Sequence, residues 1–249
     1  MTKILLCGAC GKMGGNVLTL LADDPEATVV CGVDLYPKEI GVPVHKTFLD
    51  VTEDVDVIID FSSPVGLQER LEFAKTRGAG IVLASTGFTE SDFALIKNYE
   101  SSVAIFRTAN LSLGINLMQA LVKAAAQVLG DAFDVEIIEK HHNLKKDAPS
   151  GTALMLADSV NEAFDGNKKF IYGREGIVGA RTKKEVGIHA VRGGTIVGEH
   201  EVIFAGEDEV ITISHSAASK RVFAVGAIRA AKWLVGKAPG RYEMKDLLD

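Results

Sequence analysis

Residues 3–25 read KILLCGACGKMGGNVLTLLADDP, and they carry the clearest fold signal in the chain. A short apolar run suited to a buried strand comes first, a glycine-rich turn follows, and apolar residues at helical spacing then continue up to Pro25. A second apolar run, TVVCGVDLY at residues 28–36, forms a strand that we expect to end at Asp34. The order strand, turn, helix, strand predicts the first unit of a parallel sheet.

The glycine-rich turn has the spacing of a nucleotide-binding loop. Gly8, Gly11 and Gly14 give GxxGxxG, Cys10 stands where the commoner dinucleotide fingerprint has its second glycine, and Asp34 follows Gly14 by twenty residues. Small residues let the backbone approach a pyrophosphate, the helix N-terminus binds it, and a carboxylate accepts the ribose hydroxyl groups. A tight turn without a ligand is the alternative, but the strand before it and the helix after it favour nucleotide binding.

The alternation of strands and helices continues along the chain. We predict strands in residues 55–64, 80–88 and 102–110, with helices between them. Each residue at a strand end is by itself an ordinary polar cap. Ligands of open parallel sheets lie beyond the carboxyl ends of the strands, however, so together these residues should line one crevice with the glycine turn. They are Phe61, Ser62, Ala84, Ser85, Thr86, Thr108, Ala109 and Asn110.

The periodicity changes after residue 110. A long helical stretch comes first, and residues 185–216 then alternate apolar and polar side chains between glycines, which is typical of antiparallel strands. Residues 221–234 form a helix that could return to cover the first sheet. These patterns predict an α/β fold: a Rossmann-type doubly wound parallel sheet in residues 1–110 and 217–249, and a second α+β domain in residues 111–216 that carries a mostly antiparallel sheet.

Composition limits the classes of function. The 249 residues carry a formal net charge of −6, and no long basic stripe with interleaved aromatic residues is present, which argues against nucleic-acid binding. The three cysteines lie within the first 31 residues and form no spread disulfide framework, so we expect a reducing cytoplasm. No stretch reads as a secretory signal or as the roughly 18 apolar residues of a membrane span.

The segment EKHHNLKKDAPSGTA, residues 139–153, concentrates groups that can do chemistry. Ser150 is a good helix N-cap, so the N–H groups of Gly151 and Thr152 should point outward at the positive end of a helix dipole. Three lysines add positive charge within an acidic chain, which indicates a small acidic ligand. The alternative is a solvated basic turn with one histidine in the packing.

The motifs of the chain resemble those of a known family. HHNLKKDAPSGT is similar to the signature of the 4-hydroxy-tetrahydrodipicolinate reductase (dihydrodipicolinate reductase) family of bacterial lysine and diaminopimelate synthesis. The resemblance extends over essentially the whole chain, through GACGKMG, STGF, ANLSLGIN, GREGIVGAR, GIHAVRGGTIVGEHEV and SHSAASKRVFAVGAIRAAKWL. It implies reduction of a cyclic imine dicarboxylate by NADH or NADPH with loss of a hydroxyl group, and a homotetramer built through the sheets of the second domain.

The resemblance also implies roles for individual residues. His141 is the candidate catalytic acid or base, and Lys145 is its proton-donating partner. Substrate contacts are expected at His142, Ser150, Gly151, Thr152 and Thr86. Cofactor contacts are expected at Gly8, Ala9, Cys10, Gly11, Lys12, Met13, Gly14, Asp34, Phe61, Ser62, Ala84, Ser85, Thr86, Thr108, Ala109, Asn110 and Leu111.

The chain departs from the family pattern in two places. Asn143 and Leu144 replace an Arg-His pair, which bears on substrate affinity, and the loop after Asp34 is short, which bears on the choice of cofactor. The Asp34 charge favours NADH over the 2′-phosphate of NADPH, while Lys12 and Lys38 should offset part of that repulsion.

The chemistry itself is consistent with these residues. A histidine titrates near neutrality and can exchange a proton with the substrate, and lysine can hold a carboxylate. No metal is required, and the remaining histidines are too scattered in the sequence to indicate one. A thiol-based aldehyde dehydrogenase is excluded because no cysteine follows Cys31. A non-catalytic NAD(P)-sensing protein remains an alternative, because it would keep the glycine turn without needing His141 and Lys145.

Overall fold

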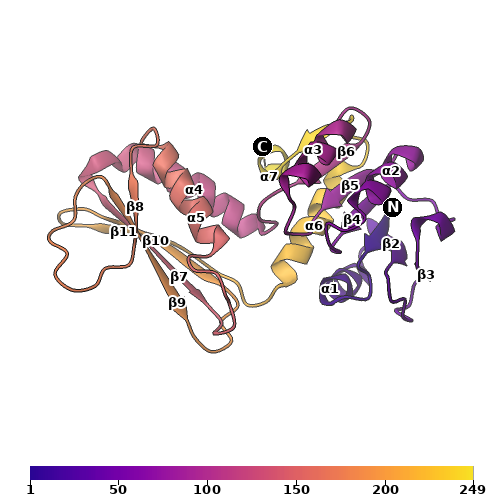
Figure 1. Ribbon diagram of the computed structural model, residues 1–249, viewed down its shortest axis with the longest axis horizontal. Coiled ribbons are helices and arrows are strands. Elements are labelled where there is room, and N and C mark those ends of the chain that lie inside the picture. Colours follow the sequence, from indigo (N-terminus) through magenta and orange to yellow (C-terminus); the bar gives the residue numbers. More distant parts are fainter. Residues whose placement is uncertain (249) are drawn as a thin grey trace. The chain divides into compact units, whose positions relative to one another are not determined.

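The computed structural model describes residues 1–248, which divide into two compact units (Figure 1). Unit 1 comprises Met1–Ser112 together with the chain from Arg221 onward, and unit 2 comprises Leu113–Lys220. Unit 2 is therefore inserted into unit 1.

Unit 1 is built on a seven-stranded sheet in the order β12-β6-β5-β4-β1-β2-β3, and every pairing in it is parallel. The strands are β1 (Thr2–Cys7), β2 (Ala27–Val33), β3 (Val44–His45), β4 (Val57–Asp60), β5 (Gly80–Leu83), β6 (Ala104–Arg107) and β12 (Gly240–Tyr242). The helices are α1 (Lys12–Leu21), α2 (Leu67–Arg77), α3 (Glu90–Tyr99), α6 (Arg221–Leu234) and α7 (Met244–Leu248), with a 3-10 turn at Phe48–Asp50.

The central strands of this sheet are buried on both faces, as continuous apolar runs require. Leu5 and Ile58 pack in one cluster with Leu71 of α2 and Ile96 of α3. Helix α6 packs on β4, β5 and β6 and against α1. The doubly wound parallel sheet predicted from the sequence is thereby confirmed.

Unit 2 is a five-stranded sheet in the order β11-β10-β7-β9-β8 with two helices. Its elements are α4 (Leu113–Leu129), a 3-10 turn (Gly130–Ala132), β7 (Asp134–His141), α5 (Gly151–Glu162), β8 (Lys169–Tyr172), β9 (Glu185–Arg192), β10 (Glu199–Ala205) and β11 (Val210–Ser216). The sequence predicted a mostly antiparallel sheet, but the sheet is mixed. Strand β10 pairs antiparallel with β7 and β11, whereas β9 pairs parallel with β7 and β8. Alternating apolar and polar residues indicate that one face of a strand is buried, but they do not indicate the direction in which the strand runs.

Helix α4 needs a separate remark because of its composition. With the turn that follows it, residues Leu113–Ala132 are long and apolar enough to cross a membrane by length and composition alone, contrary to the sequence-based expectation. Its buried residues Ile115, Met118, Val122 and Ala126 belong to the apolar core of unit 2, beside α5 and the sheet. Core packing accounts for the apolar face of this helix.

Candidate active site

The glycine turn follows β1 directly, and bare backbone is required at two of its positions. Gly8 has φ +71°, and a Cβ there would lie 3.0 Å from the Phe61 carbonyl oxygen. A Cβ on Gly14 would collide with the Ala9 carbonyl oxygen. Because Gly11 is the N-cap of α1, Lys12, Met13 and Gly14 form the first helical turn and leave its N–H groups at the turn. These residues fit a pyrophosphate at a helix N-terminus.

The Asp34 carboxylate, at the end of β2, holds the glycine turn in place. One of its oxygens accepts from the Cys10 N–H at 3.0 Å, and the other accepts from the Tyr36 N–H at 3.0 Å. The Asp34 N–H donates to the His45 carbonyl oxygen at 3.1 Å. The predicted ribose reader is thus also a structural part of the turn that it follows.

The other predicted cofactor residues lie at the same edge of the unit 1 sheet. Phe61 and Ser62 follow β4, residues 84–86 follow β5, and residues 108–111 follow β6, each at the carboxyl end of a parallel strand. The structure therefore brings the whole predicted cofactor set, including Thr86, to one edge of unit 1.

A buried ion pair supports the turn after β4. The Asp60 side chain accepts from the Ser62 N–H at 2.9 Å and from its hydroxyl at 2.5 Å, and the Arg70 Nε lies 2.8 Å from the second carboxylate oxygen. Burial raises the pKa of Asp60, although the Arg70 charge and the Ser62 hydrogen bonds oppose the rise. This pair fixes the backbone on which Phe61 and Ser62 stand.

A cavity of about 480 Å³ opens beside this edge. Its lining includes Gly8, Asp34 and Ser62 from the predicted set, and also Lys46 from the segment after β3. Lys12 and Lys38 were expected to offset the charge of Asp34. Among residues 1–248, neither of them lines this cavity. Lys46 escaped prediction because only the pairing of β3 with β2 brings it beside Asp34.

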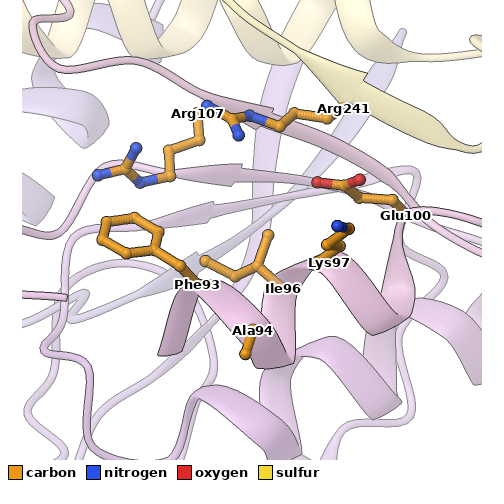
Figure 2. A pocket seen from close by; sticks show the side chains of 7 residues that line it. All are labelled: Phe93, Ala94, Ile96, Lys97, Glu100, Arg107 and Arg241. Carbon is orange, nitrogen blue, oxygen red and sulfur yellow. The ribbon is translucent and has the colours of Figure 1, made fainter. Parts of the chain in front are cut away.

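A second cavity of about 380 Å³ lies between α3 and the ends of β6 and β12 (Figure 2). The Arg107 guanidinium lies over the ring of Phe93, 4.4 Å from its centroid, and its pKa is lowered by burial and then by the charge of Arg241. Arg241 is itself paired with Glu243 at 2.6 Å, and Glu100 adds a negative charge to the lining. No residue predicted to bind cofactor or substrate lines this cavity among residues 1–248.

The histidine pair stands at the end of β7 in unit 2. Val135, Ile137 and Glu139 are the buried residues of this strand, so Glu139 occupies an inward position in an otherwise apolar row. The His141 Nδ1 lies 2.6 Å from a Glu139 carboxylate oxygen. An inward-facing carboxylate thus lies beneath the candidate catalytic histidine.

Every remaining acceptor position of Glu139 is occupied as well. The two Arg192 NH groups donate to its two oxygens at 2.7 and 2.8 Å, and the Ser150 N–H donates at 2.9 Å. Burial alone would raise the pKa of this carboxyl, but the hydrogen bonds from Arg192, His141 and Ser150 outweigh it and hold the pKa below its ordinary value. Glu139 is therefore an ionised carboxylate with full hydrogen-bond partners.

The loop after His141 is tied to the turn after β9. The Gly193 N–H donates to the His141 carbonyl oxygen at 2.9 Å, and the Asn143 N–H donates to the Gly194 carbonyl oxygen at 3.2 Å. The Lys145 N–H donates to the His142 carbonyl oxygen at 3.1 Å, and the Lys145 ammonium donates to Asp147 at 2.9 Å. His141, His142 and Lys145 are thus held in one compact loop.

The start of α5 closes this group of residues. Ser150 caps the helix by accepting from the Ala153 N–H at 3.2 Å, which confirms the predicted cap, and Gly151 and Thr152 form the first helical turn. The Ser150 hydroxyl also lies 3.2 Å from the His200 Nε2. Burial, followed by the nearby His141, lowers the pKa of His200 to about 4.

One set of possible metal ligands lies in unit 1. Cys31, His45 and Glu53 place ligand atoms within 4.8 Å of one another, which the spread of histidines in the sequence had not indicated. The His45 Nε2 lies 3.0 Å from both Glu53 oxygens, and burial together with the Glu53 charge raises the pKa of the Cys31 thiol to about 12. The thiol is accordingly protonated here.

Sequence reasoning missed the partners of His141 rather than His141 itself. Glu139 was visible as a charge at an inward position of an alternating strand, and that mismatch is a usable signal. Arg192 and His200 gave no such signal, because only strand pairing brings them to Glu139.

Comparison with known proteins covers nearly the whole chain. The family model described as dihydrodipicolinate reductase, N-terminus, matches residues 2–111, and the one described as dihydrodipicolinate reductase, C-terminus, matches residues 114–248. The two matched ranges divide close to the boundary between Ser112 and Leu113 at which unit 2 begins.

Named relatives agree with these family models. The chain is 49% identical over 248 residues to the 4-hydroxy-tetrahydrodipicolinate reductase of Caldanaerobacter subterraneus subsp. tengcongensis, with 100% of this chain and 98% of the relative covered. It is 44% identical over 249 residues to the protein of that name from Clostridium botulinum, with the same shares covered. The solved dipicolinate-bound dihydrodipicolinate reductase from Paenisporosarcina sp. TG-14 shares the fold, with a TM-score of 0.77, 24% identity, and 98% of this chain and 97% of that chain covered. The resemblance found in the sequence is confirmed, and the chain belongs to the dihydrodipicolinate reductase family.

Proposed function

We propose that this chain is a 4-hydroxy-tetrahydrodipicolinate reductase, which uses NADH or NADPH to form tetrahydrodipicolinate in the diaminopimelate route to lysine. The observation that carries the proposal is the loop of residues 141–152, in which a histidine held by a buried carboxylate, a lysine and a helix N-terminus come together. Relatives of that name that match over the full chain support it.

The cofactor would be held by unit 1. The glycine turn and the start of α1 offer backbone N–H groups to a pyrophosphate, Asp34 offers carboxylate oxygens to a ribose, and the cavity beside Asp34 has room for an adenosine moiety. When bound, the nicotinamide supplies the hydride. The strand ends at residues 84–86 and 108–111 would orient it.

The substrate dicarboxylate would be held by unit 2. Lys145 provides a charged donor, and the N–H groups of Gly151 and Thr152 lie in the first turn of α5, where the helix dipole favours an anion. His142 adds a further polar contact from the same loop. His141 would exchange the proton that balances hydride addition, because a positioned imidazole can act as a general acid or base.

We also propose that the protein is a cytoplasmic homotetramer assembled through unit 2. The edge strand β11 supports this, because its Val210 and Ile211 are 62% and 38% exposed. An apolar edge strand needs a partner or a cover. Light scattering on the purified protein tests the assembly, and charged substitutions at both positions should weaken it.

The decisive experiment is an assay of NADH and NADPH oxidation with freshly generated 4-hydroxy-tetrahydrodipicolinate. Turnover that depends on both substrates supports the reductase. Tight NAD(P)H binding without any turnover would instead favour a non-catalytic NAD(P)-sensing protein of the same fold, which needs unit 1 but not His141 or Lys145.

A further inference from the structure

We propose that Glu139 is a positioning residue for catalysis: it fixes His141 in the tautomer that carries hydrogen on Nδ1, so that Nε2 is the atom that exchanges a proton with the substrate. The inference rests on the proposed function, because it takes His141 as the acid or base.

The hydrogen-bond geometry assigns the tautomer. An ionised carboxylate can only accept hydrogen bonds, so the 2.6 Å contact between the His141 Nδ1 and Glu139 requires hydrogen on that nitrogen. The other donors to the carboxylate are two Arg192 groups and the Ser150 N–H, so four donors meet its four lone-pair positions. Glu139 can therefore hold His141 without losing its hydrogen bonds to Arg192 and Ser150.

Strand register makes this arrangement rigid. His141 lies opposite Arg192 in the parallel pairing of β7 with β9, and Glu139 lies opposite His200 in the antiparallel pairing of β7 with β10. The three strands therefore place all four side chains on one face of the sheet. Glu139 is 0% exposed, so water does not compete for its oxygens.

A purely structural ion pair is the alternative explanation, and two observations count against it. The row of inward residues on β7 is otherwise apolar, so an apolar side chain at position 139 would satisfy the core without desolvating a charge. A structural ion pair between the strands would be complete with Glu139 and Arg192 and would not require His141. The shortest contact of Glu139 is nevertheless with His141.

Gly198 and His200 lie beside the part of the His141 ring that faces away from Glu139. A Cβ on Gly198 would lie 3.1 Å from the His141 Nε2, so a glycine at this position avoids crowding that nitrogen. The His200 ring meets the His141 ring edge-on, with centroids 5.2 Å apart, and its lowered pKa keeps it neutral in the neutral pH range. The nearest ring therefore adds no second positive charge next to a protonated His141.

The test combines kinetics with a matched control. Glu139→Gln keeps the shape but removes the charge and one acceptor, so kcat should fall roughly 10- to 100-fold, while the substrate KM and the NADH Kd change little. Glu139→Asp should recover part of the loss because it restores a carboxylate. Glu136→Gln is the control: Glu136 is on the same strand and also binds an arginine and a histidine, Arg174 and His189, and its loss should leave kcat unchanged.

A double-mutant cycle separates positioning from a general loss of structure. If Glu139 acts through His141, Glu139→Gln should have no further effect on kcat in a His141→Gln background. Independent losses that multiply would overturn the positioning role. A kcat that falls in His141→Gln but stays at the wild-type value in Glu139→Gln would overturn positioning alone. Native turnover in His141→Gln would overturn the catalytic assignment and the proposal with it.

Nitrogen NMR of the histidine rings tests the tautomer in the wild-type protein without using activity. The wild-type protein should show the His141 ring with hydrogen on Nδ1, assigned by its loss in His141→Gln, and a downfield ring N–H proton from the short hydrogen bond. Hydrogen on Nε2 in the neutral ring of the wild-type protein would overturn the proposal.

Discussion

His141 and Arg192 stand directly opposite each other in the parallel pairing of β7 and β9, and both donate to the same Glu139 oxygen, at 2.6 and 2.7 Å. A histidine and an arginine that share one acceptor keep that carboxylate ionised. The candidate acid or base is therefore anchored to the sheet, while Lys145 is carried by a loop and can adjust to a ligand.

The first prediction concerns turnover. His141→Gln or Lys145→Ala should lower kcat by about 100-fold or more, because each removes a group that moves or donates a proton, while NADH binding to unit 1 stays nearly intact. Steady-state kinetics and NADH titration measure the two effects. Lys146→Ala, which changes the exposed neighbouring lysine, is the control and should stay close to wild type. A double variant of His141 and Lys145 with near-native turnover would remove this loop from the mechanism.

The second prediction concerns the carboxylate site at the start of α5. Pyridine-2,6-dicarboxylate should compete with the substrate and should raise the melting temperature, because it binds only the folded protein. Thr152→Pro deletes one N–H donor in the first turn, where proline is otherwise tolerated, so the dicarboxylate Kd should rise. Calorimetry measures the Kd, and a melting curve of the variant alone checks its folding. An unchanged Kd in a folded variant would contradict the assignment.

The third prediction concerns cofactor choice. Both cofactors should work, with NADH equal or better and the preference within about two decades, since roughly 1.4 kcal/mol accompanies each tenfold step. Asp34→Ala should shift the balance toward NADPH, although both cofactors should lose some affinity because the Cys10 N–H loses its acceptor. The measurement is kcat/KM for each cofactor at one ionic strength. A tenfold or greater preference of the unmodified protein for NADPH would show that Asp34 does not read the ribose.

The fourth prediction uses the cavity beside Asp34. Lys46→Ala should lower kcat/KM for NADPH more than for NADH, because Lys46 lines the cavity and its charge attracts a 2′-phosphate. Lys38→Ala is the matched control, since Lys38 does not line that cavity in the described part of the chain. Equal losses for the two cofactors in Lys46→Ala would contradict this role.

The fifth prediction concerns acid stability. The pKa of His200 falls from 6.5 to about 4 on folding, so the unfolded chain binds its proton first as the pH drops. The associated stability is present above the unfolded pKa and is lost between pH 6.5 and about 4, an effect of about 3 kcal/mol. Hydrogen exchange of β10 amides measures it, and His200→Gln should flatten the dependence. A variant as pH-sensitive as wild type would point to another group.

Local sequence patterns predicted most of unit 1 because its strands, turns and helices follow one another in the chain. The glycine turn and Asp34 could be found this way, since each is defined by its distance from the neighbouring strand. Unit 2 was harder to predict, because β9 and β10 approach β7 from more than forty residues away along the chain, and their directions are not encoded in alternation. The partners of Glu139 depend on the register of β7 with β9 and β10, so only Glu139 itself could be recognised from the sequence.

The insertion of unit 2 into unit 1 has a consequence for protein synthesis. All five strands of unit 2 lie between Leu113 and Lys220, whereas the unit 1 sheet lacks α6 and β12 until the end of the chain has been made. Helix α6 also fits against the Leu111 carbonyl oxygen only because Gly226 has no side chain. Domains fold as units while the ribosome delivers them. The nucleotide-binding unit is therefore begun first and completed last. The histidine site can assemble on the nascent chain before that unit is complete.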